Sequence, residues 1–235
     1  MVTISTVTII GEEEEFAEQC VRSAMRIADE IIIVYDPKAR DATKEIITEL
    51  ARFDERIKIY MNKWVEGSNQ KQFAMMKATK EWILFLDGDE VLDDEAPAII
   101  KETLEKNTDF DSFRLKGHHY ISSLGSEDAS VPEHYWEGRL VKNTNSLSFA
   151  LGKQHAILQG YSKIGSIDKT IIHHYGYCKN IQRIMNMYIE NMRKLQIHTP
   201  EFLHQWKNSH VLGSYPVKPC TIDQHPRLIR EKFMI

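Results

Sequence analysis

Hydrophobic positions in the first half of the chain follow two alternating patterns. Short apolar runs rich in β-branched residues predict strands, and each is followed by a segment whose apolar residues recur at helical spacing. The strand-like runs are 2–10, 31–35, 57–61 and 82–86, and the helix-like segments are 12–27, 43–50, 68–79 and 96–104. Strands that alternate with helices pair in parallel, so the pattern predicts an α/β fold with a doubly wound, mostly parallel sheet flanked by helices.

The second half of the chain is less regular. Short strands separated by long loops are expected at 113–115, 139–141 and 171–173. A helix with one apolar stripe is predicted over 180–196, and after Pro200 three further prolines indicate an irregular tail that ends in one short helix. We therefore expect one domain over residues 1–178 that carries the binding sites, and a C-terminal helix and tail over 179–235 packed on it.

Composition and charge exclude several classes of protein. The 235 residues are 42% hydrophobic and 27% charged, which is typical of a globular protein. A net charge of -4 argues against a mainly electrostatic nucleic-acid binder, because such proteins need a basic surface. No apolar run approaches the roughly 20 residues of a membrane span, and the first residues do not resemble a signal peptide. Three scattered cysteines indicate no disulfide framework, so we expect a cytoplasmic protein.

Acidic residues stand where several predicted strands end. In an open α/β sheet, ligands bind beyond the carboxyl ends of the strands. The first strand ends at residues 11–12, the second ends at Asp36, and the fourth runs into Asp87-Gly88-Asp89. Two carboxylates so spaced suit a divalent cation, because Mg²⁺ is commonly held by one or two carboxylates and substrate phosphates. Gly88 permits close approach of the backbone to a ligand, although the segment alone is equally compatible with an acidic turn.

Several segments of the chain follow one another in a recognisable order. They are 16–20, 28–34, Asp36 with 41–43, 82–90 around the paired aspartates, 139–142 and 171–177. In order and spacing they resemble the first helix, the second strand, the Asp-x-Gly-Ser-x-Asp-x-Thr loop, the Asp-x-Asp segment, the Arg-Leu-Phe-Arg segment and the Ile-x-His-Tyr-Gly-Tyr segment of glycosyltransferase family 2. The resemblance covers about residues 3–195, implies the GT-A fold, and is most like that of bacterial lipopolysaccharide-core transferases.

The resemblance implies a donor site made of five residues. Asp36 would hydrogen-bond the nucleotide base, and Asp87 would contact the ribose or the donor sugar. Lys71 stands where the family usually has Arg, so it would face the donor, where a basic side chain adds electrostatic stabilisation. Glu12 and Gly88 are assigned to the same site.

The resemblance also implies a metal site for Mn²⁺ or Mg²⁺. Asp89 would bind the cation, bridged to the diphosphate, and His174 or its neighbour His173 would be a later ligand. A metal acts as a Lewis acid on a leaving diphosphate, which is the chemistry that breaking a glycosyl–phosphate bond needs. Because side chains alternate along a strand, at most one of the two histidines is expected to face the site.

The chain departs from the family pattern where a general base is expected. The usual His-Glu pair is His155-Ala156, and Ala156 has no carboxylate. A base must come within hydrogen-bond distance of the acceptor hydroxyl. Glu137, just before the segment that contains Arg139, is our substitute candidate, and we expect it to open into the same cleft as Asp89.

These features predict a metal-dependent, inverting glycosyltransferase of the hexosyltransferase type. The expected donor is a UDP- or GDP-sugar and the acceptor hydroxyl belongs to a glycan, a lipid-linked molecule or a protein, with no nucleic-acid partner. The family resemblance leaves peripheral contact with the inner membrane surface open.

Two alternatives remain at this stage. One is a relative that binds a nucleotide or sugar without catalysis, which the departures from the family would explain. The other is a phosphatase of the haloacid-dehalogenase type, because Asp87-Gly88-Asp89-Glu90-Val91 also fits that nucleophile motif. That fold normally places the motif on its first strand, whereas strand and helix units precede it here.

Overall fold

The computed structural model describes residues 2–150, 156–180, 185 and 216–234, which form an α/β fold. The strands are β1 (Ile4–Ile10), β2 (Glu30–Tyr35), β3 (Ile57–Met61), β4 (Trp82–Asp87), β5 (Glu90–Leu92), β6 (Ser112–Ile121), β7 (Ser126–Asp128), β8 (His134–Lys142), β9 (Ser148–Ala150), β10 (Ile157–Gln159), β11 (Ile164–Tyr177) and β12 (Val217–Pro219). The helices are α1 (Ala17–Met25), α2 (Thr43–Phe53), α3 (Gly67–Met75), α4 (Ala96–Lys106) and α7 (Arg227–Phe233), with a 3₁₀ turn η2 at Ile222–Gln224.

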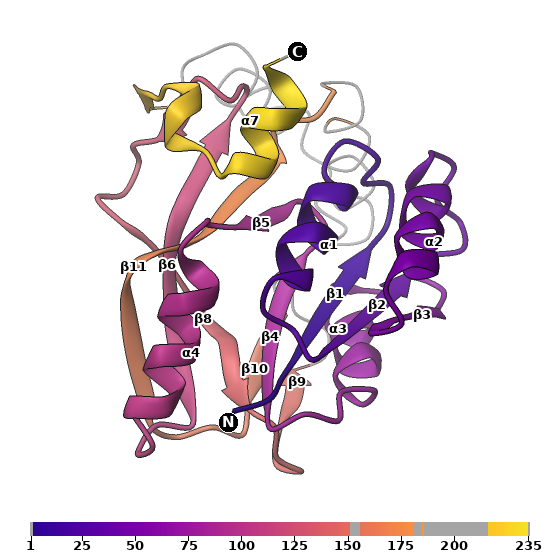
Figure 1. The fold of residues 1–235 in the computed structure, drawn as a ribbon, viewed down its shortest axis with the longest axis vertical. Coiled ribbons are helices and arrows are strands. Elements are labelled where there is room, and N and C mark those ends of the chain that lie inside the picture. The colour runs from indigo at the N-terminus through magenta and orange to yellow at the C-terminus, as the bar shows by residue number, and fades with distance from the viewer. Residues whose placement is uncertain (1, 151–155, 181–184, 186–215, 235) are drawn as a thin grey trace, which may run out of the picture.

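The central sheet joins a parallel half to a half in which most strands pair antiparallel and only β6 and β11 pair in parallel (Figure 1). Strands β3, β2, β1 and β4 lie side by side and all pair in parallel. Strand β8 then runs antiparallel to β4, and β6 runs antiparallel to β8. Strand β11 lies beside β6 and also pairs with β5. Helical crossovers connect the parallel strands, so the predicted α/β sheet flanked by helices is confirmed.

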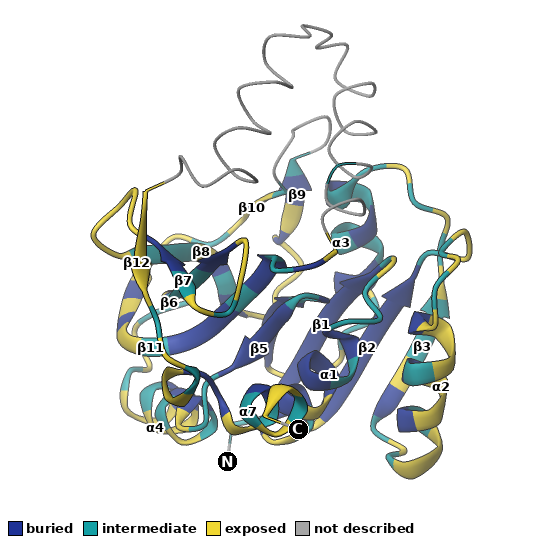
Figure 2. Cartoon of the chain, turned by 90° about the horizontal axis from the view of Figure 1, so that it is seen from above, coloured by how far each residue is buried: buried dark blue, intermediate teal, exposed yellow. Residues whose placement is uncertain are grey.

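Structural layers cover both faces of the sheet. Figure 2 shows α1, α4 and α7 on one side and α3 with β9 on the other, with buried strands between them. In β2, Ile31 and Ile33 pack in a cluster with residues of α1 and α2, whereas Ile32 and Val34 pack in a cluster with residues of α3. The continuous apolar run of this strand is therefore explained by burial on both faces.

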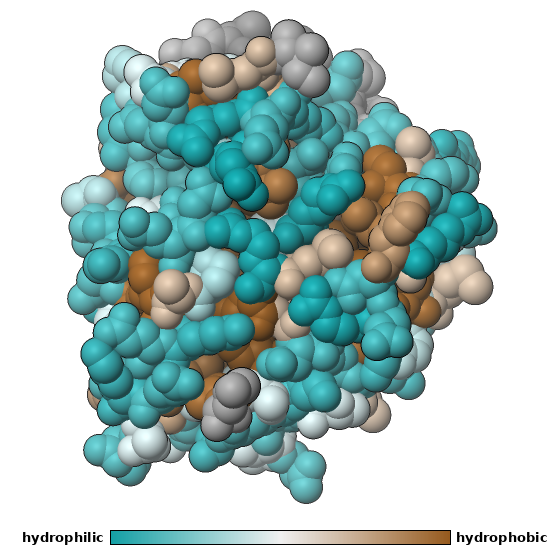
Figure 3. Space-filling model, viewed as in Figure 1, coloured by the Kyte–Doolittle hydropathy of each residue, from teal (hydrophilic) through white to brown (hydrophobic). Residues whose placement is uncertain are grey.

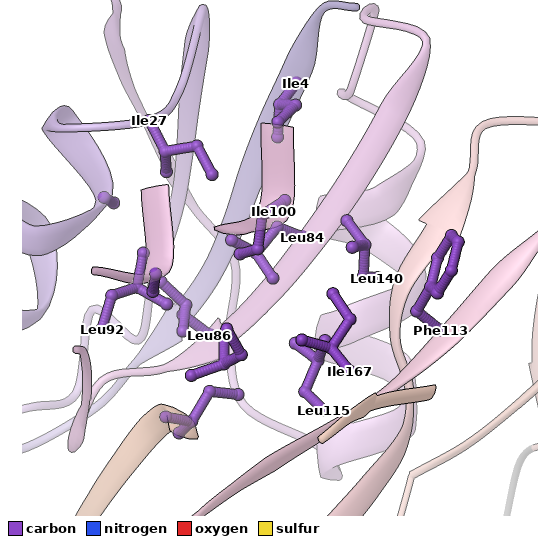
Figure 4. Packing of buried hydrophobic residues seen from close by; sticks show 14 of the residues in the cluster. Ile4, Ile27, Leu84, Leu86, Leu92, Ile100, Phe113, Leu115, Leu140 and Ile167 are labelled. Carbon is purple, nitrogen blue, oxygen red and sulfur yellow. The ribbon is translucent and has the colours of Figure 1, made fainter. Parts of the chain in front are cut away.

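One hydrophobic cluster fixes α1 and α4 on the sheet. Figure 4 shows Ile4 of β1, Leu84 and Leu86 of β4, Ile27 and Ile100 among its members, and all five are at most 2% exposed. Burying each such side chain contributes about 1.5–3 kcal/mol. The outer surface of the same side is mostly hydrophilic (Figure 3), as expected for helices that turn one stripe toward the core.

The strands of the second half are longer than the sequence predicts. The short strands expected at 113–115, 139–141 and 171–173 lie inside β6, β8 and β11. Those strands have 10, 9 and 14 residues. Beyond the predicted run, β6 contains polar residues such as Lys116 and His118, whose strand conformation comes from pairing with neighbouring strands. Strand preference depends on such pairing more than on local sequence.

The described C-terminal residues pack on the domain. Strand β12 pairs with β7, Ile229 of α7 is fully buried, and the ring of Phe233 lies 5.9 Å from that of Phe16. Of the helix predicted over 180–196, only Asn180 and Met185 are described; Asn180 is not helical and Met185 is, and the rest lies outside the described residues. None of the described helices is long and apolar enough to cross a membrane.

Gly117 of β6 gives a direct test of this packing. A Cβ atom there would lie 2.1 Å from the backbone oxygen of Ile172 and 2.6 Å from the Trp136 ring. We expect Gly117→Ala to lower the free energy of unfolding by about 3 kcal/mol or more, because the core cannot accept the added atom without shifting backbone. Urea denaturation would measure the change.

The matched control is Gly67→Ala, since a Cβ there meets nothing within 4 Å. It should change stability by no more than about 1 kcal/mol. An unchanged urea midpoint for Gly117→Ala would contradict the close approach of β6 and β11.

Candidate functional site

Acidic residues of the parallel strands meet at one edge of the sheet. Ile9 of β1 stands opposite both Val34 of β2 and Asp87 of β4. Asp36, which follows β2, and Asp87 therefore lie at the same carboxyl edge, where open α/β sheets bind ligands.

Asp87 lies in a network with two cations. The Nζ atom of Lys71, on α3, is 2.7 Å from Oδ1 of Asp87, and Nη2 of Arg139, on β8, is 2.9 Å from Oδ2. The same Nη2 atom is 2.8 Å from Oε1 of Glu90, whose Oε2 accepts a hydrogen bond from the backbone N–H of Asp87. Arg139 thus joins the end of β4 to the start of β5.

Burial and charge act differently on the two acids. Burial would raise the pKa of Asp87, but the charges of Arg139 and Lys71 outweigh it and hold that pKa well below its usual value. Burial dominates at Glu90 and raises its pKa to about 7 although Arg139 opposes the shift. Asp87 is therefore the more acidic carboxyl group of this pair.

Asp89 lies in a second network built around Lys179. The Nζ atom of Lys179 is 2.8 Å from Oδ2 of Asp89 and 2.6 Å from Oε2 of Glu13, and its side chain is only 3% exposed. On the other side, Nε2 of His174 is 3.6 Å from Oδ1 of Asp89. Burial raises the pKa of Glu13 to about 8. Burial also acts to raise the pKa of Asp89, but Lys179 and His174 together outweigh it and lower that pKa.

The two histidines of β11 face opposite sides, as the alternation predicts. His173 is buried, with Nδ1 2.8 Å from the hydroxyl of Tyr120 and Nε2 3.0 Å from Asp93. His174 faces Asp89 instead. His174 and Asp89 are the candidate metal ligands at this edge. His173 instead contacts Tyr120 and Asp93 on the opposite side of β11.

The other predicted donor residues lie around these networks. Asp36 accepts a hydrogen bond from the backbone N–H of Lys38, and Lys71 forms the ion pair with Asp87 described above. Glu12 is exposed and accepts a hydrogen bond from the backbone N–H of Arg40, so it faces the loop after β2.

Gly88 provides the room that Glu13 needs. A Cβ at position 88 would lie 3.0 Å from Cγ of Glu13 and 3.2 Å from a side-chain carbon of Ile10. A larger residue between Asp87 and Asp89 would therefore press against the side chain that shares Lys179 with Asp89.

Glu137, the candidate base, is exposed on β8 and makes no hydrogen bond or ion pair with another described residue. Glu137 precedes Gly138, whose φ of 65° belongs to the left-handed region. Burial raises the pKa of the nearby Tyr161 phenol, and the charge of Glu137 adds to that shift. Glu13 and Glu90, rather than Glu137, are the acids that share cations with the paired aspartates. Ala156 packs against a hydrophobic cluster.

Sequence reasoning missed three side chains of the site: Glu13, Arg139 and Lys179. Glu13 directly follows Glu12, and only the turn before α1, closed by the N–H of Ala17 on the Glu13 carbonyl, decides which one turns inward. Arg139 belongs to the segment 139–142, which resembles the family, but the sequence does not indicate a role for its side chain. Lys179 is 90 residues from Asp89 and had no local signal.

The chain belongs to glycosyltransferase family 2. The family model, described as "Glycosyl transferase family 2", matches residues 5–125, just over half of the chain. The matched region includes Asp87, so the family assignment replaces the phosphatase alternative.

Curated relatives match part of the chain. An uncharacterised glycosyltransferase of Rickettsia typhi is 33% identical over 95 residues, which is 40% of this chain and 30% of the relative. An uncharacterised glycosyltransferase of Rickettsia bellii is 34% identical over 92 residues, 39% of this chain and 29% of the relative. The aligned segments thus cover less than a third of each relative's length.

Solved structures share the fold. Residues 1–349 of TarS from S. aureus superpose with a TM-score of 0.57 at 13% identity, covering 89% of this chain and 70% of that one. The complex of the same TarS segment with UDP-GlcNAc gives a TM-score of 0.55 at 14% identity, covering 90% of this chain and 74% of that one. This chain therefore has the GT-A fold that TarS also has.

Removing Arg139 tests the network at Asp87. Arg139→Met should destabilise the protein by about 3 kcal/mol in urea denaturation, because it leaves Asp87 and buried Glu90 without their shared cation. Adding Glu90→Gln should restore part of the loss, since it removes one buried acid.

The control for Arg139→Met is Arg22→Met. Arg22 forms an exposed pair with Glu18, and such pairs are worth at most about 1 kcal/mol. If Arg139→Met and Arg22→Met unfold at the same urea concentration, Arg139 does not hold the site together.

Proposed function

We propose that the carboxyl edge of the sheet binds a nucleotide-diphospho-sugar and that the protein transfers its sugar to an acceptor hydroxyl. The observation that carries the proposal is the convergence of Asp87 and Asp89 with Lys71, Arg139 and Lys179 at the ligand-binding edge of a family 2 domain. TarS, which has the same fold, has been solved with UDP and with UDP-GlcNAc.

The charge of the edge supports a cation together with the donor. Four carboxylates face three permanent cations there, and the members are Glu13, Asp87, Asp89, Glu90, Lys71, Arg139 and Lys179. A buried charge without a partner is costly. A divalent cation and the diphosphate of a nucleotide sugar have opposite charges of equal size, so their joint binding leaves this near balance unchanged.

The residues present fit a divalent metal ion. Asp89 offers Oδ1, and Nε2 of His174 lies 3.6 Å away, so both could bind one ion. Carboxylate oxygen suits Mg²⁺ and Mn²⁺, whereas imidazole favours transition metals, and the combination therefore favours Mn²⁺. Lys179 already contacts the second oxygen of Asp89 and would remain beside the diphosphate as a positive charge.

The proposed reaction is a direct displacement with inversion. The acceptor oxygen forms a bond to the anomeric carbon while the bond from that carbon to the diphosphate oxygen breaks, and the electron pair stays on the diphosphate. A bound metal would supply Lewis-acid stabilisation of that leaving group. Lys71 and Lys179 add fixed positive charge near it, Asp36 binds the base, and Asp87 positions the ribose or sugar.

Glu137 is the proposed acceptor of the hydroxyl proton. Its carboxylate is exposed and unpaired among the described residues, and it stands two residues before Arg139, which contacts Asp87. An acceptor that enters along β8 would therefore meet Glu137 before the donor. The acceptor is proposed to be a glycan, a lipid-linked molecule or a protein.

The metal assignment predicts a cation-dependent response to nucleotide. At a concentration 100 times its dissociation constant, UDP or GDP should stabilise the wild type by about 2.7 kcal/mol with Mn²⁺. That corresponds to a rise in Tm of about 5–10 °C for a domain of this size. The rise should be much smaller in EDTA, and Asp89→Asn should remove the difference.

The control for Asp89→Asn is Asp109→Asn, an exposed aspartate before β6, which should behave as the wild type. Equal shifts with Mn²⁺ and EDTA would overturn the metal assignment but not donor binding. The absence of any shift with either nucleotide would overturn the donor proposal.

A base at Glu137 predicts a defect in chemistry without a defect in donor binding. Glu137→Gln should lower transfer by about 10²–10⁴-fold, the usual contribution of a general base. Nucleotide-induced stabilisation should stay as in the wild type. The measurement is nucleotide release from UDP- and GDP-sugars with a panel of sugar acceptors.

The control for Glu137→Gln is Glu105→Gln, an exposed residue of α4, which should keep full activity. Near-normal turnover of Glu137→Gln would remove Glu137 as the base. A wild type that binds donor but releases no nucleotide above background would favour the non-catalytic alternative.

A further inference from the structure

A group of side chains that could hold a metal ion lies outside the networks of Asp87 and Asp89. His119 of β6, Asp128 at the end of β7 and His134 at the start of β8 each offer one ligand atom, and these atoms lie within 4.8 Å of one another. Neighbouring strands place them together, since β6 pairs with both β7 and β8. The donor reaction proposed above uses none of the three.

Two imidazole nitrogens of this group have no hydrogen-bond partner among the residues that the structure describes. The Nε2 atoms of His119 and His134 are both buried and make no hydrogen bond to a described residue. The Nε2 atom of His134 lies only 3.4 Å from Oδ2 of Asp128, but their geometry is not that of a hydrogen bond. A buried polar atom without a partner is costly, so the two nitrogens indicate a missing ligand.

The carboxylate of the group is held in place by its neighbours. Oδ1 of Asp128 accepts a hydrogen bond of 2.7 Å from the backbone N–H of Ser130, which leaves Oδ2 on the side of His134. Asp128 also stands opposite Val217 in the pairing of β7 with β12. Such outer contacts orient a metal ligand before the metal arrives.

We propose that His119, Asp128 and His134 form a site for a transition-metal ion of the Zn²⁺ class, separate from the cation of the donor site. Two imidazoles and one carboxylate form a donor set typical of Zn²⁺ sites with three protein ligands and one open position. Ligand atoms about 2.05 Å from a tetrahedral ion are about 3.3 Å apart. The group needs only small side-chain movements to reach that spacing.

The separation from the donor site comes from side-chain direction. His174 is oriented with Nε2 toward Asp89, and its ring lies edge-on to the ring of His119, with centroids 4.4 Å apart. The two groups are therefore adjacent but offer different ligand atoms. Oxygen-rich coordination at Asp89 favours Mn²⁺ or Mg²⁺, and the nitrogen-rich group favours Zn²⁺.

A bound ion would join three strands and, through β7, the C-terminal strand β12. Binding to the folded state alone raises stability. Zn²⁺ should therefore stabilise the chain without any nucleotide, which separates this site from one that requires a donor.

The test uses the full chain after removal of metals with a chelator and dialysis. Isothermal titration with Zn²⁺ in the absence of nucleotide should give one tight site, with a parallel rise in Tm. His119→Gln and His134→Gln should each weaken binding by at least about tenfold. Co²⁺ in place of Zn²⁺ should give visible ligand-field bands without the absorption of a thiolate ligand.

Two control variants locate the ion. His118→Gln changes the neighbouring histidine of β6, which pairs with Glu127 instead, and should leave Zn²⁺ binding unchanged. Asp89→Asn should also bind Zn²⁺ as the wild type. Far-UV circular dichroism confirms that each variant is folded, and His134→Gln serves as the second variant if His119→Gln fails to fold.

Three results would overturn the proposal: a wild type without a tight Zn²⁺ site, normal binding by the folded His134→Gln variant, or loss of binding in Asp89→Asn. The last result would assign the ion to the donor edge. None of these results depends on sugar transfer, so failure of this site and failure of the proposed function are distinguishable.

Discussion

The guanidinium of Arg139 makes the contact on which the geometry of the site depends. It holds the half-buried Asp87 and the buried Glu90 together. Without this cation the two carboxylates would repel each other at the end of β4, and the turn that presents Asp89 would lose its anchor. Because Arg139 belongs to β8, this single side chain also ties the antiparallel half of the sheet to the parallel half.

The two halves of the sheet therefore make different contributions to one edge. The parallel half supplies the acids at strand ends, where its topology always gathers ligand-binding residues. The later part of the chain supplies Arg139 and Lys179, which pair with Asp87 and Asp89, and His174, which lies beside Asp89 as a second candidate metal ligand. The acids at this edge are already paired with cations, so binding of the proposed donor would need little rearrangement of charge.

Side chains alternate along β6 and β11, so the two adjacent histidines of each strand face opposite sides. In each pair, one histidine contacts an acid of the surrounding structure and the other faces a candidate site. His118 and His173 pair with Glu127 and Asp93 respectively. Their sequence neighbours point the other way, where His174 meets Asp89 and His119 meets the group proposed to bind zinc. A shift of either strand by one residue would exchange these roles.

The alternating strands and helices and the position of the paired aspartates follow from the amino-acid sequence alone. Strand β3 begins and ends where its apolar pattern does, and Asp87 follows a buried run, because both features are encoded within a few residues. In contrast, contacts between distant segments turn Glu13 rather than Glu12 inward and bring Lys179 to Asp89 across 90 residues. Ion pairs between distant residues leave no periodic pattern, and the lengths of β6 and β11 depended on partner strands whose hydrogen bonds exist only after folding.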